Sequence, residues 1–579
     1  MTNGGAPATA AIAAAAMRSE RRVVAALRTA GAVSAETATP LTTDGVMLRG
    51  AMARLVRKGA VVARGDGAYW LDEAGYTEVR ETRRSRIFLT MFGIAALLII
   101  VSAVTIAKAE TPAGPPLVGQ IPSLTLTESP AILRPDQAAY RALYEELVET
   151  DTTLSNGSCT LAAERMAARL TAAGYAAPDV EVVVAPEQPK LGALIATLPG
   201  TDASATAILL LAHIDVVEAR RADWARDPFT LVEEDGFFYA RGASDDKAQA
   251  SVWVDTFVRL KGEGFRPRRT LKLALTCGEE TSEIWNGVEW LLANRPEALR
   301  AGFALNEGAG GQLDVHAGRV ALNVQAGEKV YQDFTLELTN PGGHSARPRK
   351  DNAIAAMGAA MAGLTAHDFP LELTPVTRGY FAAVAETNAQ YAADLRALTA
   401  KAAPDVDAAA RLAAANPIWN ATMRTTCIPT LIEGGHALNA QPQKVTVNVN
   451  CRILPGHSIA ETQGEIASAL DNPAITIATV GAPSPTSPPP PLGADILGPI
   501  QAAAAAIWPG VPVVPTLSTG ATDGRFTNAA GIPTYGVTGM FTDPDGNGVH
   551  GLNERIRVRS LYEGRDFLFD LVKRYAMAE

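Results

Sequence analysis

Three short polar clusters, each following a strand-like apolar run, carry the side chains that could do chemistry. They pair His213 with Asp215, Asp245 with Asp246, and Glu279 with Glu280. Imidazole and carboxylate ligands delivered from neighbouring strand ends are what a hydrolytic zinc site needs. Because ligands bind outside the carboxyl edge of an open α/β sheet, we expect the three clusters to meet there.

The first two pairs each predict one metal ligand with a supporting group. His213 and Asp215 would share one face of an extended segment, so that one binds the metal while the other orients the imidazole. Asp245 would be a bridging ligand supported by the next carboxylate. Alternatively, Ser244 and Asp245 would only cap the helix that follows.

The third pair ends a buried strand and has no basic neighbour in sequence. Uncompensated carboxylates in such a place are costly unless a cation meets them. A metal would meet Glu280, and Glu279 would then serve as general base toward a metal-bound water. The alternative is a solvated loop end.

An alternation of strands and helices is expected to position these clusters. Predicted strands at 207–212, 270–276 and 303–306 alternate with helices at 247–261 and 282–293, a pattern typical of a doubly wound, mainly parallel α/β sheet. The catalytic domain would comprise residues 135–328 and 456–579.

From about residue 329 the pattern changes, which predicts a second, α+β domain at 329–455 inserted into the first. Its predicted elements are a strand at 331–338, a helix at 352–364, a helical stretch at 381–415, and an antiparallel strand pair at 425–432 and 444–453.

The amino-terminal part differs in charge from the rest. Residues 1–86 contain 13 Lys and Arg against 8 Asp and Glu, whereas the whole chain of 579 residues has a net charge of −10. Three helices followed by a hairpin around Asp66 predict a cytoplasmic winged-helix-like domain. It could bind DNA, or serve only for protein contacts.

Residues 87–107 form an uncharged apolar run long enough to span a bilayer as a helix. Arg83, Arg84 and Arg86 precede the run, so the amino terminus should stay cytoplasmic and the rest should be extracytoplasmic. A signal peptide is disfavoured because the run starts so far into the chain. Residues 108–134 would be a linker. The sequence therefore predicts a single-pass membrane protein.

Seven segments occur in one order along the chain and resemble the aminoacylase/carboxypeptidase family of di-zinc metallopeptidases. They are residues 213–217, 224–229, 239–247, 277–280, 306–308, 342–345 and 550–554. The resemblance covers about residues 135–579. It is closest to the carboxypeptidase S branch, and the family also includes aminoacylase, acetylornithine deacetylase and succinyl-diaminopimelate desuccinylase.

The resemblance implies two zinc ions per subunit, with Glu279 as base and Asp215 in support. The implied metal ligands are His213, Asp245, Glu280, Glu307 and His550. Where relatives often carry Asp-Glu-Gly, this chain carries Asn306-Glu307-Gly308. Either Asn306 or Glu307 could therefore be the ligand, and we expect Glu307.

The inserted segment 329–455 resembles the family's lid and dimerisation domain, which implies a homodimer. His344 matches the family histidine that reaches a neighbouring subunit's active site to stabilise the oxyanion, and Asn439 matches another position near the substrate. Arg452 and Arg525 are candidates for binding a substrate carboxylate, because a guanidinium can bond both oxygens. Arg452 could equally belong to a structural ion pair.

The four cysteines are too scattered for a disulfide scaffold. Cys427 and Cys451 lie on the two predicted antiparallel strands, so pairing could set them opposite each other, and an extracytoplasmic location would permit a disulfide. Two unpaired cysteines are the alternative.

These expectations predict a membrane-anchored zinc metallohydrolase. It would cleave the amide bond of short peptides or N-acyl amino acids that have a free carboxyl terminus. The alternative is a membrane-bound regulator that joins a DNA-binding winged helix to a non-catalytic, ligand-sensing domain. The intact Glu279 argues against that alternative. The preferred side chain or acyl group and the metal used in the cell cannot be predicted from the sequence.

Overall fold

The computed structural model describes residues 20, 23–40, 46–64, 66–72, 75–76, 133–281, 284–481 and 483–578. The chain divides into two compact units, Met1–Val118 and Gly119–Glu579. In the described residues no helix combines the length and the apolar character needed to cross a bilayer. The predicted membrane helix at 87–107 lies outside the described residues.

Among its described residues the amino-terminal unit contains a helical segment at 23–29, a further helix and a three-stranded sheet. Its elements are β1 (Thr39–Pro40), α2 (Val46–Arg57), β2 (Val61–Ala63) and β3 (Ala68–Leu71), with strand order β1-β3-β2. The predicted hairpin is confirmed, since β2 and β3 pair antiparallel. Val23, Leu27, Leu55 and Leu71 form part of a small buried core. The winged-helix interpretation and the binding of DNA stay predictions.

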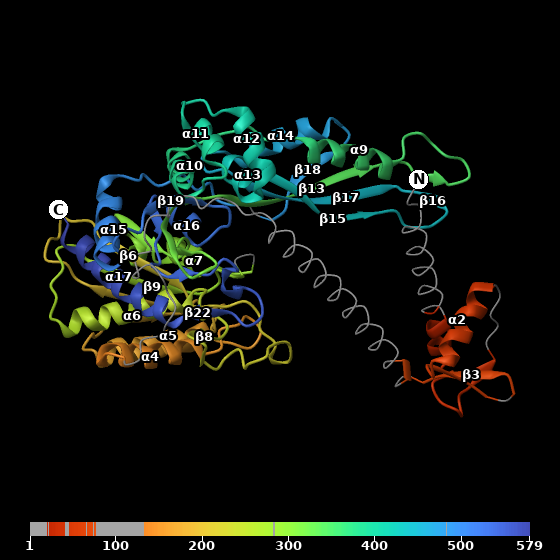
Figure 1. Cartoon of the computed structure of the whole chain (residues 1–579), viewed down its shortest axis with the longest axis horizontal. Coiled ribbons are helices and arrows are strands. Elements are labelled where there is room, and N and C mark those ends of the chain that lie inside the picture. Colours follow the sequence, from red (N-terminus) through yellow and green to blue (C-terminus); the bar gives the residue numbers. More distant parts are fainter. Residues whose placement is uncertain are drawn as a thin grey trace, which may run out of the picture. The chain divides into compact units, whose positions relative to one another are not determined.

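The second unit is built on a ten-stranded sheet (Figure 1). Nine of its strands follow the order β21-β11-β12-β20-β10-β6-β9-β5-β4, and β19 pairs with β12. The strands are β4 (Val180–Val183), β5 (Ala193–Leu198), β6 (Ile208–His213), β9 (Leu271–Thr276), β10 (Phe303–Asn306), β11 (Gly311–Leu313), β12 (Arg319–Glu328), β19 (Val513–Ser518), β20 (Thr534–Gly536) and β21 (Phe541–Thr542).

The sheet is mixed, which corrects the prediction of a mainly parallel sheet. β6 runs parallel to β9 and β10, and β10 runs parallel to β20. By contrast, β4 pairs antiparallel with β5, β5 with β9, and β12 with both β11 and β20. The parallel centre carries the first and third of the predicted polar clusters, at the ends of β6 and β9. Strands β4, β5, β11 and β12 are not among the strands predicted from the strand–helix alternation, so that alternation could not indicate their direction.

Helices cover both faces of this sheet, and the strand residues alternate between the two cores. Ile208, Leu210 and Ala212 pack in the larger core, and Leu209 and Leu211 in the smaller one. Residues of α4 (Pro135–Val148), α5 (Cys159–Ala172), α6 (Lys247–Gly262), α15 (Ala494–Ile507) and α17 (Val558–Met577) line the larger core. Residues of α7 (Gly287–Asn294), α8 (Pro296–Leu299) and α16 (Gly524–Ala529) line the smaller one. A separate sheet has the order β22-β8-β7, with β7 (Val232–Glu234), β8 (Phe237–Tyr239) and β22 (Arg555–Arg557).

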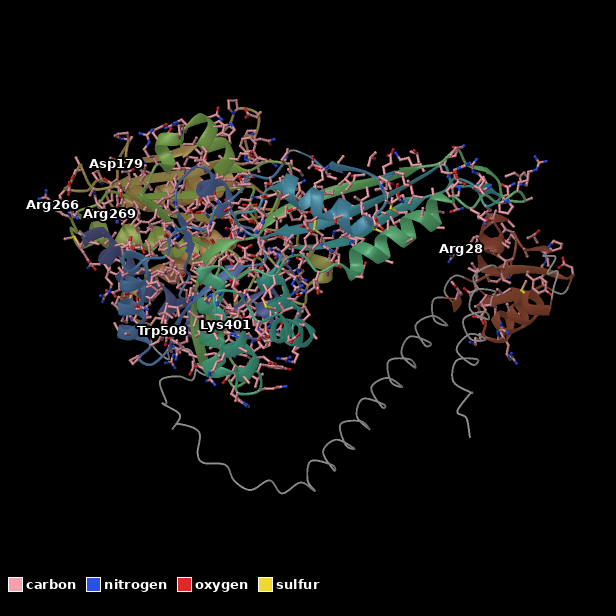
Figure 2. All side chains as sticks on the ribbon, turned by 90° about the horizontal axis from the view of Figure 1, so that it is seen from above. Arg28, Asp179, Arg266, Arg269, Lys401 and Trp508 are labelled. Atoms are coloured by element: carbon pink, nitrogen blue, oxygen red, sulfur yellow. A yellow bond between two sulfur atoms is a disulfide. The ribbon has the colours of Figure 1, made fainter. Side chains whose placement is uncertain are left out.

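Another sheet, of order β15-β17-β13-β18, lies within residues 329–480, which are called the lid below. Its elements are β13 (Val330–Thr339), α9 (Ala353–Ala366), β15 (Thr426–Gly434), β17 (Lys444–Ile453), α14 (Ile459–Leu470) and β18 (Thr476–Thr479). Because β18 pairs with β13, the lid continues past the predicted boundary at residue 455. Figures 1 and 2 both show the lid sheet extending away from the ten-stranded sheet. At its far end β14 (Gly343–His344) pairs with β16 (Ala440–Gln441).

The predicted helical stretch at 381–415 is a set of short helices with a core of its own. The helices are α10 (Pro375–Thr387), α11 (Ala392–Thr399), α12 (Val406–Ala415) and α13 (Pro417–Met423). Lys329, fully buried where β12 passes into β13, donates from Nζ to the carbonyl oxygens of Ala421 and Arg424 and to Thr426 Oγ1. This one ammonium group therefore ties the end of α13 and the start of β15 to the boundary between sheet and lid.

All four cysteines form disulfides. Cys427 and Cys451 are direct partners across β15 and β17, which confirms the predicted pairing. Cys159 and Cys277, which are 118 residues apart, form a second disulfide that the sequence did not predict.

Candidate metal centre

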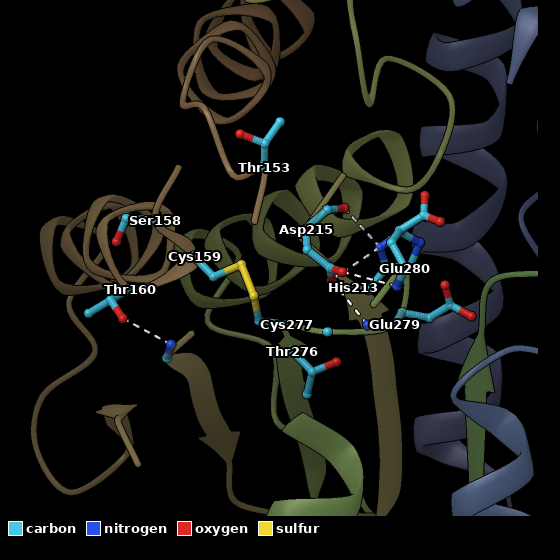
Figure 3. Close-up of a disulfide and its surroundings, with 12 residues drawn as sticks. Thr153, Ser158, Cys159, Thr160, His213, Asp215, Thr276, Cys277, Glu279 and Glu280 are labelled. Atoms are coloured by element: carbon cyan, nitrogen blue, oxygen red, sulfur yellow. Dashed lines mark hydrogen bonds and ion pairs between the residues drawn. A yellow bond between two sulfur atoms is a disulfide. The ribbon is translucent and has the colours of Figure 1, made fainter. Parts of the chain in front are cut away.

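Two of the three predicted clusters, and also Glu307, lie at the carboxyl ends of neighbouring strands of the large sheet, and Asp245 reaches the same place from the turn before α6. His213 is the last residue of β6, Glu279 follows β9, and Glu307 follows β10. These strands are adjacent in the order β10-β6-β9, so their ends deliver side chains to one place. Ligand atoms of His213, Glu279 and Glu307 lie within 4.8 Å of one another, as do those of His213, Asp245 and Glu280. Figure 3 shows His213, Glu279 and Glu280 at these strand ends.

The carboxylate of Asp245 lies between two imidazoles. Its Oδ1 is 3.1 Å from His213 Nε2, and its Oδ2 is 3.2 Å from His550 Nε2. Glu280 Oε1 is 2.9 Å from the same nitrogen of His550, and Glu307 Oε2 is 3.7 Å from His213 Nε2. Asp245 is thus placed to bridge two cations, one on the side of His213 and Glu307 and the other on the side of His550 and Glu280.

Side-chain direction at the end of β10 decides which of Asn306 and Glu307 can be a metal ligand. Asn306 is buried and donates from Nδ2 to Thr522 Oγ1, away from the imidazoles. Glu307 instead lies beside His213. Alternation of side chains at the end of β10 therefore places Glu307, and not Asn306, with the cluster.

Asp215 lies against the imidazole of His213 and also contacts the turn that follows β9. The Nδ1 atom of His213 lies 3.1 Å from the backbone oxygen of Asp215 and 3.6 Å from its carboxylate. The carboxylate accepts the backbone N–H groups of Glu279 and Glu280, at 3.3 and 3.0 Å (Figure 3). Asp215 therefore fixes both the imidazole and the turn that carries the other two carboxylates.

The titration of the cluster reflects an excess of negative charge. Burial and the nearby Glu307 raise the pKa of Glu279 well above its ordinary value, and burial raises the pKa of Glu307 to about 7. Hydrogen bonds to Asp245 and Glu280 raise the pKa of His550 to about 10. Burial alone would lower the pKa of His213, but Glu307, Asp215 and Asp245 outweigh it and raise this pKa well above its ordinary value. Each raised pKa favours the protonated form of its group, and the bound proton reduces the excess negative charge of the cluster.

These residues fit a pair of divalent cations. Four carboxylates and two imidazoles converge, and the carboxylates carry four negative charges when ionised. Two dications would balance that charge, and nitrogen and oxygen donors are typical zinc ligands. His213, Asp245 and Glu307 would hold one ion, and Asp245, Glu280 and His550 the other.

Glu554 is a functional residue that the sequence did not single out. It is fully buried, and its carboxylate accepts the backbone N–H groups of Gly242, Ser244 and Asp245 at 2.8 to 3.0 Å. Arg241 Nη1 donates to the same carboxylate at 2.7 Å. Since Glu554 follows His550 by four residues, it ties the loop of one ligand to the loop of the bridging ligand. The only indication of its role in the sequence was that Glu554 lies four residues after His550.

Asp523 is a second such residue. It is buried and accepts hydrogen bonds from Asn286 Nδ2 at 2.6 Å and from Thr276 Oγ1 at 3.2 Å. Burial raises the pKa of Asp523, which favours the protonated form of this carboxyl group. The only signal near Asp523 in the sequence was the candidate Arg525, two residues later.

The lid residues predicted for the site do not reach it within one chain. His344 and Asn439 are exposed and lie together at the end of the lid, where Ser345 N donates to the oxygen of Asn439. Arg452 and Arg525 lie nearer the boundary with the main sheet. Burial, and to a smaller extent the charge of Arg525, lowers the pKa of Arg452.

Comparison with known proteins agrees with this geometry. Residues 209–574 match the model of "Peptidase family M20/M25/M40". The chain is 28% identical to the human N-fatty-acyl-amino acid synthase/hydrolase PM20D1 over 393 residues, which cover 65% of this chain and 76% of that protein.

Two further relatives and a solved structure show the same likeness. Mouse aminoacylase-1 is 27% identical, and the match covers 70% of this chain and 87% of that protein. A probable carboxypeptidase S-like protein of Dictyostelium discoideum is 26% identical, and the match covers 66% of this chain and 74% of that protein. The fold is similar to that of an M20 family metallo-carboxypeptidase from Sulfolobus solfataricus. Its TM-score is 0.54 at 17% identity, over 77% of this chain and 100% of that one.

Proposed function

The chain belongs to peptidase family M20/M25/M40 and is a metal-dependent peptidase or amidohydrolase, and on that premise we propose a di-zinc enzyme that hydrolyses amide bonds of N-acyl amino acids or short peptides. One observation carries the proposal: the Asp245 carboxylate lies between His213 and His550, with three further carboxylates beside it.

Glu279 is the general base and acid of the proposed reaction. When bound, zinc ions polarise a carbonyl and make water more acidic. Glu279 takes the proton of the attacking water on its carboxylate and then delivers it to the leaving amine. Its buried position beside Glu307, which raises its pKa, favours retention of that proton between the two steps.

Arg452 and Arg525 bind the free carboxylate of the substrate. Neither guanidinium forms an ion pair in the part of the chain that the structure describes; Arg452 lies 4.6 Å from the ring centre of Tyr331, and Arg525 lies 4.5 Å from that of Phe526. The Nε of Arg525 is buried without a hydrogen-bond partner. Two neighbouring guanidinium groups without an ion pair among the described residues favour an anionic ligand.

A second copy of the chain completes the site. β15 is an edge strand, and Ile428, Leu431 and Ile432 on it are 61 to 69% exposed. An edge strand with exposed apolar side chains is a template for pairing with another chain. In the dimer that we propose, His344 and Asn439 at the end of the lid enter the partner's site, where His344 stabilises the developing oxyanion.

The enzyme is anchored to a membrane by residues 87–107, with the second unit in an extracytoplasmic compartment. The uncharged apolar run and the arginines before it support this topology. The two disulfides support it further, because disulfides persist in oxidising compartments.

Replacing Glu279 by Gln tests the proposal, because the amide keeps the shape of the side chain and cannot take up the proton. The full chain, loaded with zinc, would be assayed against acylated amino acids and dipeptides. We expect hydrolysis by the native protein and a loss of kcat of at least about 100-fold in E279Q, as general acid–base catalysis contributes roughly 10²–10⁴-fold. Zinc content should be unchanged. Equal hydrolysis by both proteins would contradict the assignment of Glu279.

A further inference from the structure

We propose that the Cys159–Cys277 disulfide positions the catalytic turn, defined as residues 277–280, and that the metal centre is fully active only when these two sulfurs are bonded. The inference rests on the proposed function, since it concerns the base and one metal ligand of that site. The disulfide joins the start of α5 to the residue that follows β9 (Figure 3).

The catalytic turn leaves the sheet sharply and receives no strand pairing. The ladder between β6 and β9 ends at the pair His213 and Thr276. Gly278 has a φ of 95°, and a Cβ atom there would collide with the carbonyl oxygen of Trp285. The turn can therefore be held only by contacts outside the ladder.

The side chains of the catalytic turn are acidic and face other carboxylates. Ligand atoms of Glu279 and Glu307 lie within 4.8 Å of each other, so repulsion between the two carboxylates, when both are ionised, tends to open the turn. Two backbone hydrogen bonds to Asp215 oppose this opening. The disulfide lies beside these hydrogen bonds, because a carboxylate oxygen of Asp215 lies within 4.8 Å of both sulfur atoms. The bond therefore holds Cys277 close to the carboxylate that accepts them.

The other end of the disulfide is a firm anchor. Cys159 is the first residue of α5 and is 1% exposed. Ser158 caps this helix by accepting the N–H of Leu161, and Thr160 N donates to the oxygen of Lys190. Ala162, Met166 and other residues of α5 pack in the larger core. The bond therefore transfers the rigidity of a packed helix to the catalytic turn.

The second disulfide of this chain provides a matched control. Cys427–Cys451 joins neighbouring lid strands that are already paired on both sides of the bond. Its removal should affect stability without touching the catalytic turn.

The test compares Cys159→Ala/Cys277→Ala with Cys427→Ala/Cys451→Ala in the full chain. For the first variant we expect a zinc Kd weaker by about tenfold or more, measured by competition with a chromophoric chelator, since supporting contacts of a metal ligand are worth about 10–100-fold. We also expect kcat to fall by about 10–100-fold with KM within about twofold, because small misplacement of catalytic groups has that effect. The control should match the native protein in both quantities. Native values in the first variant, or equal losses in both variants, would overturn the proposal.

A second measurement does not depend on the folding of a variant. The native chain is reduced with a water-soluble phosphine at graded denaturant and then diluted into buffer. Each disulfide gains two electrons and two protons, and the phosphine becomes the phosphine oxide with oxygen from water. Alkylation and mass spectrometry count the reduced fraction of each pair. We expect activity and zinc affinity to fall in proportion to reduction of Cys159–Cys277 alone. Full activity with that pair reduced would overturn the proposal.

The zinc readout separates the two proposals. If no amide substrate is cleaved by the native chain, the proposed function fails. The positioning role is then still judged by the difference in zinc Kd between the two double variants.

Discussion

At the residue scale, the site is a concentration of buried negative charge arranged around two imidazoles. Asp245 lies between His213 and His550, and the other carboxylates approach from both sides. Buried carboxylates without a cation are costly, so this arrangement is stable only if protons or metal ions reduce the charge. The residues proposed to hold the ions thus make the empty cluster unfavourable.

Glu554 should control metal affinity without being a ligand. Changing Glu554 to Gln replaces an acceptor of four hydrogen bonds by a group whose –NH2 end faces backbone donors. We expect the zinc Kd to weaken by about 10–100-fold, the usual effect of losing a contact that orients a ligand. Chelator competition measures it. Glu218→Gln is the matched control, since Glu218 also accepts a backbone N–H, from Ser155 at 3.0 Å, on an exposed loop. An unchanged Kd in E554Q would contradict a positioning role for Glu554.

The sequence was informative wherever residue type alone implied chemistry. His213, Glu279 and Glu280 lie at the ends of recognisable strands of the large sheet, Asp245 comes from the turn before α6, and the ligand atoms of all four converge. Glu554 could not be predicted in the same way, because it acts on backbone N–H groups more than 300 residues earlier. Such contacts leave no local pattern in the chain.

At the scale of elements, the strands that carry the site were easier to predict than those that shape the lid. β10 and β17 have the predicted bounds, since both are clear apolar or alternating runs. β18 has only four residues and was not recognised, so the lid boundary was placed too early. The helices α10–α12 were predicted as one stretch at 381–415, which missed the start of α10 at Pro375 and the whole of α13, which begins at Pro417.

The exposed edge of β15 should be the dimer contact. We expect Ile432→Lys to shift the chain from dimer to monomer in analytical ultracentrifugation and to lower kcat, because His344 then has no partner site. The charge would oppose the apolar contact and disfavour pairing of the edge. Ile418→Lys, at a position 62% exposed on α13, is the control and should remain dimeric. A monomeric native protein with full activity would exclude this contact.

At the scale of the whole molecule, the net charge and the cysteine content differ between the two sides of the apolar run at 87–107. Net positive charge precedes residues 87–107, and all four cysteines follow them. Both disulfides belong to the second unit. A cytoplasmic first unit and an extracytoplasmic second unit would account for this distribution together.

This topology predicts that the protein extracted from its own cells contains no free thiol. Denatured but unreduced protein should react with no maleimide, and the reduced protein should react at four positions. The protein should also stay in the membrane fraction after carbonate washing and be released by detergent. Four reactive thiols before reduction, or release by carbonate, would contradict the proposed location.

The most direct test of the central claim is anomalous diffraction at the zinc edge from crystals of the zinc-loaded chain. We expect two peaks per chain, one within bonding distance of His213, Asp245 and Glu307, and the other within bonding distance of Asp245, Glu280 and His550. A single peak, or metal bound away from Asp245, would contradict a bridged two-ion centre.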